Sequence, residues 1–197
     1  MKAEALEIAK KAFDIEAKVL LDTAKQMDWT AFSKAVELLS QAERIAASGC
    51  GHSGIACRHF AHLMCCIEKP ARFLSPAEAI HGATGFLQRG DVLIMASRGG
   101  KTAELMPIID IARKRGAYVI SITENTASPM AQKSDVTLPI HVYNETDRYN
   151  AQGTSSFVAV SAVFDALQAA VIEETGFRGE QFALIHPGGA VGERLNK

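Results

Sequence analysis

The sequence has no excess of charge of either sign. Its 197 residues include 21 Lys and Arg and 22 Asp and Glu, which gives a formal net charge of −1. Proteins that coat phosphate backbones or anionic lipids depend on clustered, excess Lys and Arg. The charge balance therefore argues against nucleic acid and against a membrane as the main partner.

Long apolar segments are also missing. The first residues mix both signs of charge and contain no uninterrupted apolar stretch of the kind found in a secretory signal. The longest weakly polar stretch, 157–172, is about one helical turn shorter than a membrane span and contains Asp165 and Gln168. We therefore expect a soluble, cytoplasmic protein.

Cysteines are few and confined to one short region: Cys50, Cys57, Cys65 and Cys66. They form no spaced C-x-x-C pairs, and adjacent cysteines bridge only with strain. His59, His62 and Cys66 follow one another at one-turn intervals, a spacing that zinc ligands can have. Free cysteine, however, is among the most buried residue types. We predict reduced thiols that pack in the protein, with no metal and no other cofactor.

Short apolar runs alternate with segments of helical period along most of the chain. The runs that indicate β-strands span 44–48, 71–74, 91–97, 118–123 and 135–142. Apolar positions spaced by about 3.6 residues indicate helices over 3–27, 29–42, 54–67, 76–85, 102–115, 127–133 and 154–175. Strands that are apolar on both faces and alternate with helices are typical of βαβ units. We predict an α/β fold with a mostly parallel sheet covered by helices.

Nothing in the pattern divides the chain into several domains. It contains no internal repeat, no low-complexity tract and no linker rich in Pro, Gly or Ser. A chain of this length most often forms one domain and buries enough surface to fold without disulfides or metals. We expect a single domain with N-terminal helices over about 1–42, an α/β core over about 43–177 and a C-terminal tail over 178–197.

Two of the predicted strands end in polar, glycine-rich loops, which is where an open parallel sheet binds its ligands. The first loop, G-C-G-H-S-G at 49–54, is similar to the fingerprint of dinucleotide-binding proteins. An acidic residue should then follow about 20 positions on at a strand end, whereas Glu68 stands before a strand. Dinucleotide binding is therefore disfavoured, and Gly51, His52 and Ser53 are candidate substrate contacts.

The second loop follows the run V-L-I-M-A-S and opens a helix. It contains two hydroxyls, two glycines and two cations: Ser97, Arg98, Gly99, Gly100, Lys101 and Thr102. Close backbone approach, N–H donors and charge-assisted hydrogen bonds together suit a phosphate monoester. The loop is no Walker A motif, because Met95 occupies the position of the first glycine. We predict a phosphate site; a capped helix with surface cations is the simpler alternative.

Five segments, in this order, resemble the sugar isomerase (SIS) domain of arabinose-5-phosphate isomerases and their relatives. They are G-C-G-H-S-G, S-P-A-E-A-I-H-G, I-M-A-S-R-G-G-K-T-A-E-L, G-T-S-S at the start of a long helix, and F-A-L-I-H-P-G-G-A-V-G-E-R-L. The resemblance implies a three-layer αβα sandwich, flavodoxin- or Rossmann-like, with a five-stranded parallel sheet. It also implies that phosphosugars are interconverted between aldose and ketose forms, by homodimers or homotetramers that share sites between subunits.

The resemblance assigns binding and catalytic roles to residues of this sequence. It implies a phosphate held by Ser97, Gly100 and Thr102, and a sugar surrounded by the hydroxyls of Ser53, Thr154, Ser155 and Ser156. Acid–base catalysis would fall to Glu145 and His186, the latter contributed across a subunit boundary, with His81 as a further candidate. Moving a proton between C1 and C2 through an ene-diol needs a carboxylate or imidazole base.

The sequence also departs from the family pattern. His52 stands where these isomerases usually have a lysine. Their strand-end loop usually reads S-N-S-G-E-S, whereas here Arg98 replaces the amide, Gly99 a serine and Lys101 the glutamate. These changes make arabinose 5-phosphate an open question as the substrate. Relatives with the H-P-G-G ending often continue into a pair of CBS domains, which we expect this chain to lack.

The residues support three hypotheses for the function. The first is a phosphosugar aldose–ketose isomerase that needs neither metal nor nucleotide. The second is a phosphosugar-binding sensor without catalysis, which the changes at His52 and Lys101 favour and the presence of Glu145 and His186 disfavours. The third, a nucleic-acid regulator, would need a helix-turn-helix, and the first 40 residues supply only two helices of mixed charge.

Overall fold

The computed structural model describes residues 2–196 of the chain. Its elements, in chain order, are α1 (Ala3–Lys25), α2 (Trp29–Gln41), β1 (Ile45–Gly49), α3 (Gly51–Cys65), β2 (Ala71–Phe73), α4 (Pro76–Ala79), the 3₁₀ helix η1 (Ala83–Phe86), β3 (Val92–Ala96), the 3₁₀ helix η2 (Ala103–Leu105), α5 (Met106–Arg115), β4 (Tyr118–Thr123), α6 (Pro129–Gln132), β5 (Val136–Pro139), α7 (Thr154–Thr175), α8 (Gly179–Ile185) and α9 (Gly189–Leu195). The predicted strands are all present, with bounds that differ by a few residues. The predicted helices are present as well, except that 76–85 is divided into α4 and η1 and that 102–115 begins with the 3₁₀ helix η2.

The five strands form one parallel sheet in the order β2-β1-β3-β4-β5. β1 and β3 are buried along their whole length, because helices cover the small and apolar side chains on both of their faces. Gly49 lies opposite Ala96 in the ladder, so these two strands end level with each other. The strand order reverses between β1 and β3, and doubly wound sheets bind ligands at such a switch point. The predicted five-stranded parallel sheet is confirmed.

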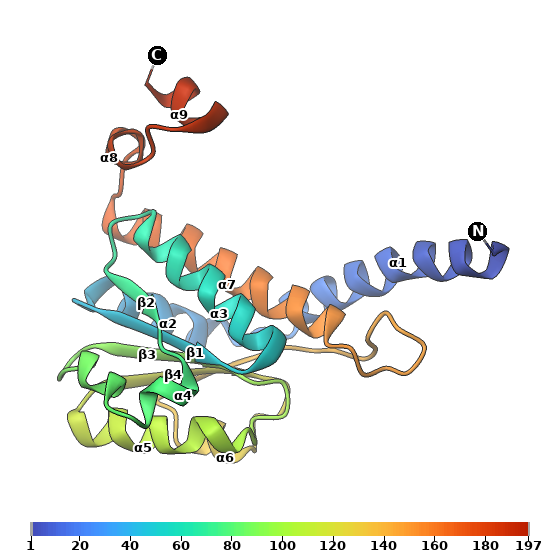
Figure 1. The fold of residues 1–197 in the computed structure, drawn as a ribbon, viewed down its shortest axis with the longest axis horizontal. Helices are drawn as coiled ribbons and strands as arrows, with labels where there is room; N and C mark the ends of the chain where they lie inside the picture. The colour runs from blue at the N-terminus through green and yellow to red at the C-terminus, as the bar shows by residue number, and fades with distance from the viewer. Residues whose placement is uncertain (1, 197) are drawn as a thin grey trace.

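Helices cover both faces of this sheet (Figure 1). α1, α2, α3 and α7 lie on one face, and α4, α5 and α6 lie on the other. Ile94 belongs to the apolar cluster of the first face, whereas its neighbours Leu93 and Met95 belong to that of the second, as alternating strand side chains require. In the first layer Phe60 of α3 stacks on Phe164 of α7, with ring centroids 4.4 Å apart. The predicted three-layer sandwich is confirmed.

Helix α7 is the long apolar helix at the centre of the first layer. By length and composition alone it could cross a membrane. In the folded chain it packs against α1, α2 and α3, and the buried side chains Ala159, Val163, Leu167 and Val171 recur every four residues along it. The hydrophobicity of α7 is therefore that of a core helix.

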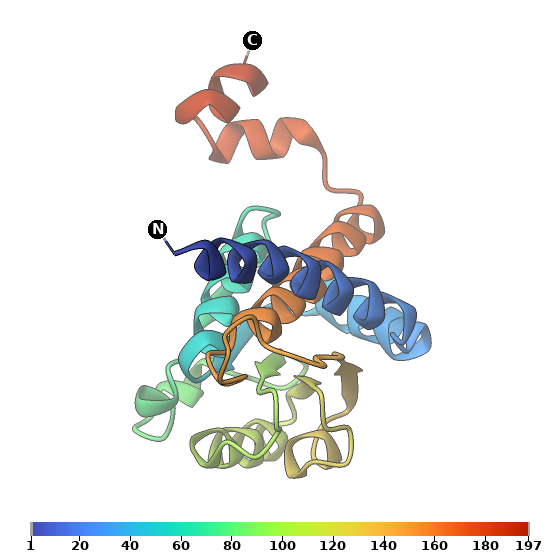
Figure 2. The same cartoon turned by 90° about the vertical axis from the view of Figure 1, so that its right-hand side faces the viewer.

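Both ends of the chain project from the sandwich (Figures 1 and 2). Helix α1 is buried only near its C-terminal end, at Val19 and Thr23, and residues 2–11 are exposed. The other projection is residues 178–196, here termed the C-terminal arm, in which α8 has no buried residue and contacts mainly α9. The sequence pattern predicted only a tail in this region, and the structure shows that it contains two short helices.

Two element bounds differ from the prediction for physical reasons. α3 begins at Gly51 rather than at residue 54, because glycine permits the left-handed φ of +54° at the turn into the helix. β5 ends at Pro139 rather than at residue 142, because its partner β4 ends at Thr123: Pro139 pairs with Thr123, and the Ile140 N–H makes a last bond to the Thr123 carbonyl at 3.1 Å. The chain therefore leaves the sheet early and forms a long loop before α7.

Candidate functional site

The candidate site lies at the carboxyl edge of the sheet, where four segments of the chain come together. They are the turn from β1 into α3, the loop from β3 to η2, the end of β4, and the loop 140–153 with the start of α7. Helices that follow parallel strands turn their N-termini toward this edge, and helix N-termini present free N–H groups and a positive dipole end. The arrangement favours an anionic ligand.

The turn from β1 into α3 is tight because of its glycines. A Cβ on Gly49 would lie 2.9 Å from the carbonyl carbon of Ser53, and one on Gly54 would lie 2.6 Å from the carbonyl oxygen of Gly49. Any larger residue at these positions would push the first turn of α3 away from β1. The predicted contacts Gly51, His52 and Ser53 consequently lie at the sheet edge.

The loop from β3 to η2 is closed by its own hydroxyls. Ser97 Oγ and Thr102 Oγ1 are 2.9 Å apart, and the Gly100 N–H donates to Ser97 Oγ at 3.2 Å. Gly100 has a left-handed φ of +62°, and a Cβ there would collide with the Ser128 side chain. Both the backbone conformation and the lack of space therefore require glycine. The structure thus brings the three residues predicted to hold phosphate into one hydrogen-bonded turn.

The two cations of this loop point in different directions. Lys101, beside the exposed Gly99, is itself exposed and forms no ion pair with any residue between 2 and 196. Arg98 leaves the loop: its Nε donates to Glu124 Oε2 at 2.8 Å, and its Nη1 donates to Glu145 Oε1 at 2.7 Å. Both were predicted as phosphate contacts, but only Lys101 is free to reach an anion at the loop in this conformation.

Glu145 is the most enclosed carboxylate of the site, with only 1% of its surface exposed. Besides the bond from Arg98, its Oε2 accepts from Thr154 Oγ1 and from the Ser156 N–H, each at 3.2 Å. Burial opposes ionisation, but the hydrogen bonds from Ser156 and the charge of Arg98 outweigh it. The pKa of Glu145 therefore lies below the ordinary value for glutamate. The side chain is a carboxylate, not a carboxylic acid, at neutral pH.

The three hydroxyl residues that open α7 have different surroundings. Thr154 Oγ1 accepts from the N–H and the hydroxyl of Thr146, each at 2.9 Å, while donating to Glu145. Ser156 is buried, and its backbone N–H donates to the Glu145 carboxylate. Ser155 is fully buried, and its hydroxyl has no hydrogen-bond partner within the described part of the chain. Of the three predicted sugar contacts at the start of α7, Thr154 is the one that is partly exposed.

His52 joins the starts of α3 and α7. It is exposed, and its ring lies edge-on to Phe157 with centroids 6.4 Å apart. A Cβ on Gly153 would lie 3.1 Å from His52 Nδ1, so the histidine rests against the residue that precedes α7. The side chain that replaces the family's usual lysine is therefore placed next to the hydroxyls at the α7 N-terminus.

The two histidines predicted to be catalytic, His81 and His186, lie apart from this cluster. His81 is exposed in the turn after α4. His186 lies on the C-terminal arm, where its ring is 5.0 Å from that of Phe182 and its Nδ1 has no partner among residues 2–196. α7 begins at the site and ends at the arm, and its 22 residues span about 33 Å. The structure does not bring His186 to the site of its own chain.

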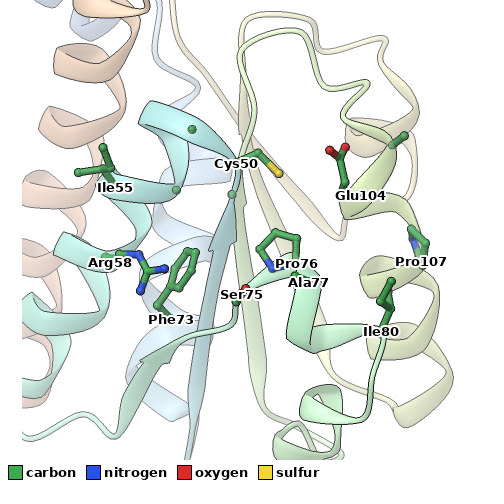
Figure 3. Close-up of a pocket in the computed structure, with 14 residues that line it drawn as sticks. Cys50, Ile55, Arg58, Phe73, Ser75, Pro76, Ala77, Ile80, Glu104 and Pro107 are labelled. Atoms are coloured by element: carbon green, nitrogen blue, oxygen red, sulfur yellow. The ribbon is translucent and has the colours of Figure 1, made fainter.

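A cleft of about 790 Å³ opens at the switch point between β1 and β3 (Figure 3). It lies between α3, the β2–α4 segment and the start of α5. Most of its wall is apolar and is formed by Ile55, Phe73, Pro76, Ile80 and Pro107. Of the residues predicted to form the site, Gly51 lines this cleft, and His81 directly follows the lining residue Ile80.

Three polar side chains of the cleft were missed by sequence analysis. In Figure 3 the Cys50 thiol points toward Glu104, which lies on the facing side of the cleft, and Arg58 lies over the ring of Phe73, 3.9 Å from its centroid. Glu104 comes two residues after Thr102, the last predicted phosphate contact, and Cys50 lies inside the first glycine loop. Their positions next to both loops were a usable signal, but alone neither residue type indicates a sugar site.

No three His, Cys, Asp or Glu side chains of residues 2–196 converge as metal ligands would. His59 Nε2 lies 3.3 Å from Asp165, and His62 Nε2 lies 3.6 Å from Cys66 Sγ, so the two histidines have separate partners. All four cysteines are free thiols. Cys57 is fully buried, and burial raises its pKa to about 12, so this thiol is inert in the folded protein.

Comparison with curated proteins shows clear relatives. Arabinose 5-phosphate isomerase KdsD of Pseudomonas aeruginosa is 38% identical over 165 residues, which cover 83% of this chain and 51% of that protein. The chain spans about half the length of the curated relatives it matches. A Listeria monocytogenes protein of known structure, named a candidate sugar-phosphate isomerase, is 36% identical with a TM-score of 0.91 and covers 95% of this chain and 100% of its own.

A second solved structure contains a ligand. The Escherichia coli CFT073 protein c3406, solved in complex with A5P, is 28% identical with a TM-score of 0.88, over 95% of this chain and 100% of that one. Residues 38–170 of the sequence also match the family described as the SIS domain. The similarity inferred from the five sequence segments is thereby confirmed, and the chain belongs to the SIS domain family.

Proposed function

We propose that this protein is a phosphosugar isomerase that interconverts aldose and ketose forms. One observation carries the proposal: a hydroxyl-closed phosphate loop and the ionised, buried carboxylate of Glu145 share one edge of the sheet. Relatives named arabinose 5-phosphate isomerase and the A5P complex of c3406 support it. Arabinose 5-phosphate is therefore the first substrate to test.

The phosphate group binds at the loop from β3 to η2. Ser97 and Thr102 supply hydroxyls, Gly100 allows the tight turn that holds them together at a position where a side chain would not fit, and Lys101 supplies an exposed positive charge. Ser53 and Thr154 lie on neighbouring helix starts and are proposed to contact the sugar hydroxyls. The phosphate then anchors the substrate while its first two carbons reach the acid–base groups.

The chemistry is a proton transfer between two neighbouring carbons. A base removes the C2 proton of the open-chain aldose while the aldehyde oxygen takes up a proton, which gives an ene-diol. Loss of the proton on the C2 oxygen and protonation of C1 then give the ketose. Glu145 is our candidate base; to reach it, the substrate must displace one of its contacts, and the longer ones are on Oε2.

A homodimer or homotetramer is proposed as the working form. His186 is separated from the start of its own α7 by the length of that helix, so it can serve only the site of a neighbouring subunit. The exposed half of α1 and the C-terminal arm offer apolar side chains for such contacts, among them Phe13 and Leu184, each 78% exposed. His81 is proposed to assist ring opening.

Other features of the proposal come from the sequence. The near-zero net charge supports a small-molecule substrate rather than nucleic acid or a membrane as partner. The relatives are metabolic enzymes, which supports a cytoplasmic location. The proposed reaction needs no metal or nucleotide, since the proton transfers require only side-chain acids and bases.

Exchange of the substrate's C2 proton with deuterated water tests the proposal. Purified protein is incubated with five- to seven-carbon phosphosugars, starting with arabinose 5-phosphate, and deuterium incorporation is followed by NMR. We expect exchange with at least one sugar and loss of exchange in the Glu145→Gln variant. Absence of exchange across the whole panel would falsify the isomerase proposal.

A non-catalytic phosphosugar sensor is the second candidate. It is favoured by Lys101 in place of the family's glutamate and by His52 in place of its lysine. A sensor binds phosphosugar, seen as a rise in melting temperature, without exchanging the C2 proton. A ligand at about 100 times its Kd should stabilise the protein by about 2.7 kcal/mol, which makes binding easy to detect even without turnover.

A further inference from the structure

Arg98 is part of the phosphate loop in sequence but not in space. Its backbone follows Ser97, yet each of its guanidinium nitrogens donates to a group outside the loop. Nε reaches Glu124 after β4, Nη1 reaches Glu145, and Nη2 donates to the Val142 carbonyl at 3.1 Å. The side chain thus ties the ends of three chain segments together.

Charge makes this arrangement a poor phosphate site. The guanidinium contributes one positive charge and is in contact with two carboxylates, so the group as a whole carries one negative charge. A phosphate dianion would be repelled by it, whereas Lys101 is exposed and has no carboxylate partner among the described residues. The loop's two cations therefore have separate tasks.

The geometry at Glu145 shows what Arg98 does instead. Oε1 of the carboxylate is held by Arg98 Nη1 at 2.7 Å, and Oε2 by Thr154 and Ser156 at the start of α7. The planar guanidinium holds Glu124 and Glu145 at fixed relative positions, which a lysine cannot reproduce. Burial of Glu145 without a positive partner would favour its protonated form.

We propose that Arg98 is a positioning residue that fixes the orientation and the ionised state of Glu145, and that it takes no part in holding the phosphate. The catalytic half of this statement rests on the proposed isomerase function. The groups that face Glu145 are Arg98, the Thr154 hydroxyl and the N-terminus of α7 at Ser156; those that face Arg98 are the two glutamates and the Val142 carbonyl.

Binding measurements separate the two cations. The affinity of the full chain for arabinose 5-phosphate and for inorganic phosphate is measured by calorimetry in the Arg98→Gln and Lys101→Gln variants. We expect Lys101→Gln to weaken binding by about tenfold or more, and Arg98→Gln to change it by less than about threefold. Equal weakening in both variants would overturn the proposal, because Arg98 would then be a phosphate contact.

The pH dependence of kcat tests the role at Glu145. A base must be deprotonated, so kcat falls on the acid side of its pKa. Arg98→Gln should lower kcat by about tenfold or more at neutral pH with KM nearly unchanged, and should move this acid limb to higher pH. Arg98→Lys should restore part of the shift. Glu124→Gln leaves the Arg98–Glu145 contact in place and should not raise the pH at which kcat falls. If this pH is also unchanged in Arg98→Gln, the result contradicts the proposal.

A double-mutant cycle gives a readout that needs no activity. Unfolding by urea is compared in Arg98→Gln, Glu145→Gln and the double variant. A carboxyl whose pKa is lower in the folded state stabilises the protein above its unfolded pKa, and this contribution is lost as pH falls through the folded pKa. We therefore expect coupling at pH 7 that fades below the ordinary glutamate pKa of 4.5.

The outcomes of the cycle distinguish this proposal from the proposed function. An uncoupled pair at pH 7 would overturn the positioning role whatever the enzyme does. A coupled pair in a protein that isomerises no phosphosugar would overturn the isomerase proposal and, with it, the catalytic half of the assignment. A coupled pair together with a shifted acid limb supports both.

Discussion

The sandwich and the two projecting ends of this chain differ in how they use apolar residues. In the sandwich, large side chains such as Phe60 and Phe164 are fully buried and stack on each other. On the ends, Phe13 and Leu184 are 78% exposed within the single chain. Exposed apolar side chains gathered on one segment are typical of an interaction surface. The sandwich therefore accounts for the stability of one chain, and the ends are suited to contacts between chains.

The same contrast holds for the candidate catalytic residues. Glu145 and the phosphate loop are anchored in the sandwich by hydrogen bonds to neighbouring strand ends and helix starts. His186 belongs to the arm, where its Nδ1 finds no partner in the described chain. If, as proposed, His186 serves the site of a neighbouring subunit, association and activity should be lost together.

The largest expected effect is in the sandwich. Phe60→Ala removes a fully buried ring from its stack on Phe164 and should lower the free energy of unfolding by about 3–5 kcal/mol. Leu184→Ala on the arm is the matched control, with an expected change below about 0.5 kcal/mol when the chains are dilute. Urea unfolding measures both. Equal losses would erase the contrast between sandwich and arm.

The next effect is at the phosphate loop. Gly100→Ala places a methyl group against Ser128 at a left-handed φ and should cost about 2 kcal/mol or more, with loss of phosphosugar binding. The adjacent Gly99 has open space around its Cβ position, so Gly99→Ala should change stability by less than about 0.5 kcal/mol. Thermal unfolding with and without arabinose 5-phosphate compares the two. A stable, ligand-binding Gly100→Ala protein would contradict the proposed loop geometry.

Removal of the arm separates stability from activity. A chain of residues 1–177 should unfold within about 1 kcal/mol of the full chain, because α8 buries no side chain, yet isomerisation should fall by about 100-fold or more. Mixing of His186→Ala chains with Glu145→Gln chains should restore activity at about a quarter of the sites if partners share them. No recovery on mixing would argue for sites formed within one chain.

The smallest effect on stability is expected at α1. Leu6→Ser combined with Phe13→Ser changes exposed positions, so the unfolding free energy of dilute chains should move by less than about 0.5 kcal/mol. Association between chains should nevertheless be weaker, so the variant should be dissociated at concentrations at which the unsubstituted protein is still assembled. Light scattering or analytical ultracentrifugation would detect this difference. Lys10→Gln, nearby on the same helix, is the control and should leave the assembly intact.

The fold could be predicted from the sequence because its signals are local. Apolar runs such as 118–123 mark buried parallel strands directly, and the structure has β4 at the same residues. The helices of the arm were missed because a helix without a core partner shows no apolar periodicity. The early end of β5 follows from where its partner β4 ends, at Thr123, which the apolar run over 135–142 does not reveal.

The site was predictable where one loop contains it and unpredictable where side chains meet from afar. Ser97, Gly100 and Thr102 lie within six residues and form one turn, so their grouping follows from the sequence. Arg98 was predicted as a phosphate contact, but its two carboxylate partners lie 26 and 47 residues along the chain. No local pattern indicates which way such a side chain turns.

The length of α7 relates the position of Glu145 to that of the C-terminal arm. Its first residues hold Glu145, and its last residues lead into the arm that carries His186. Each residue added to a helix rotates the remainder of the chain by about 100° and shifts it by about 1.5 Å. An insertion into α7 would therefore turn the arm away from any partner even if both of its ends kept their contacts. In this chain, the number of residues in one core helix sets the direction in which the His186 side chain is presented.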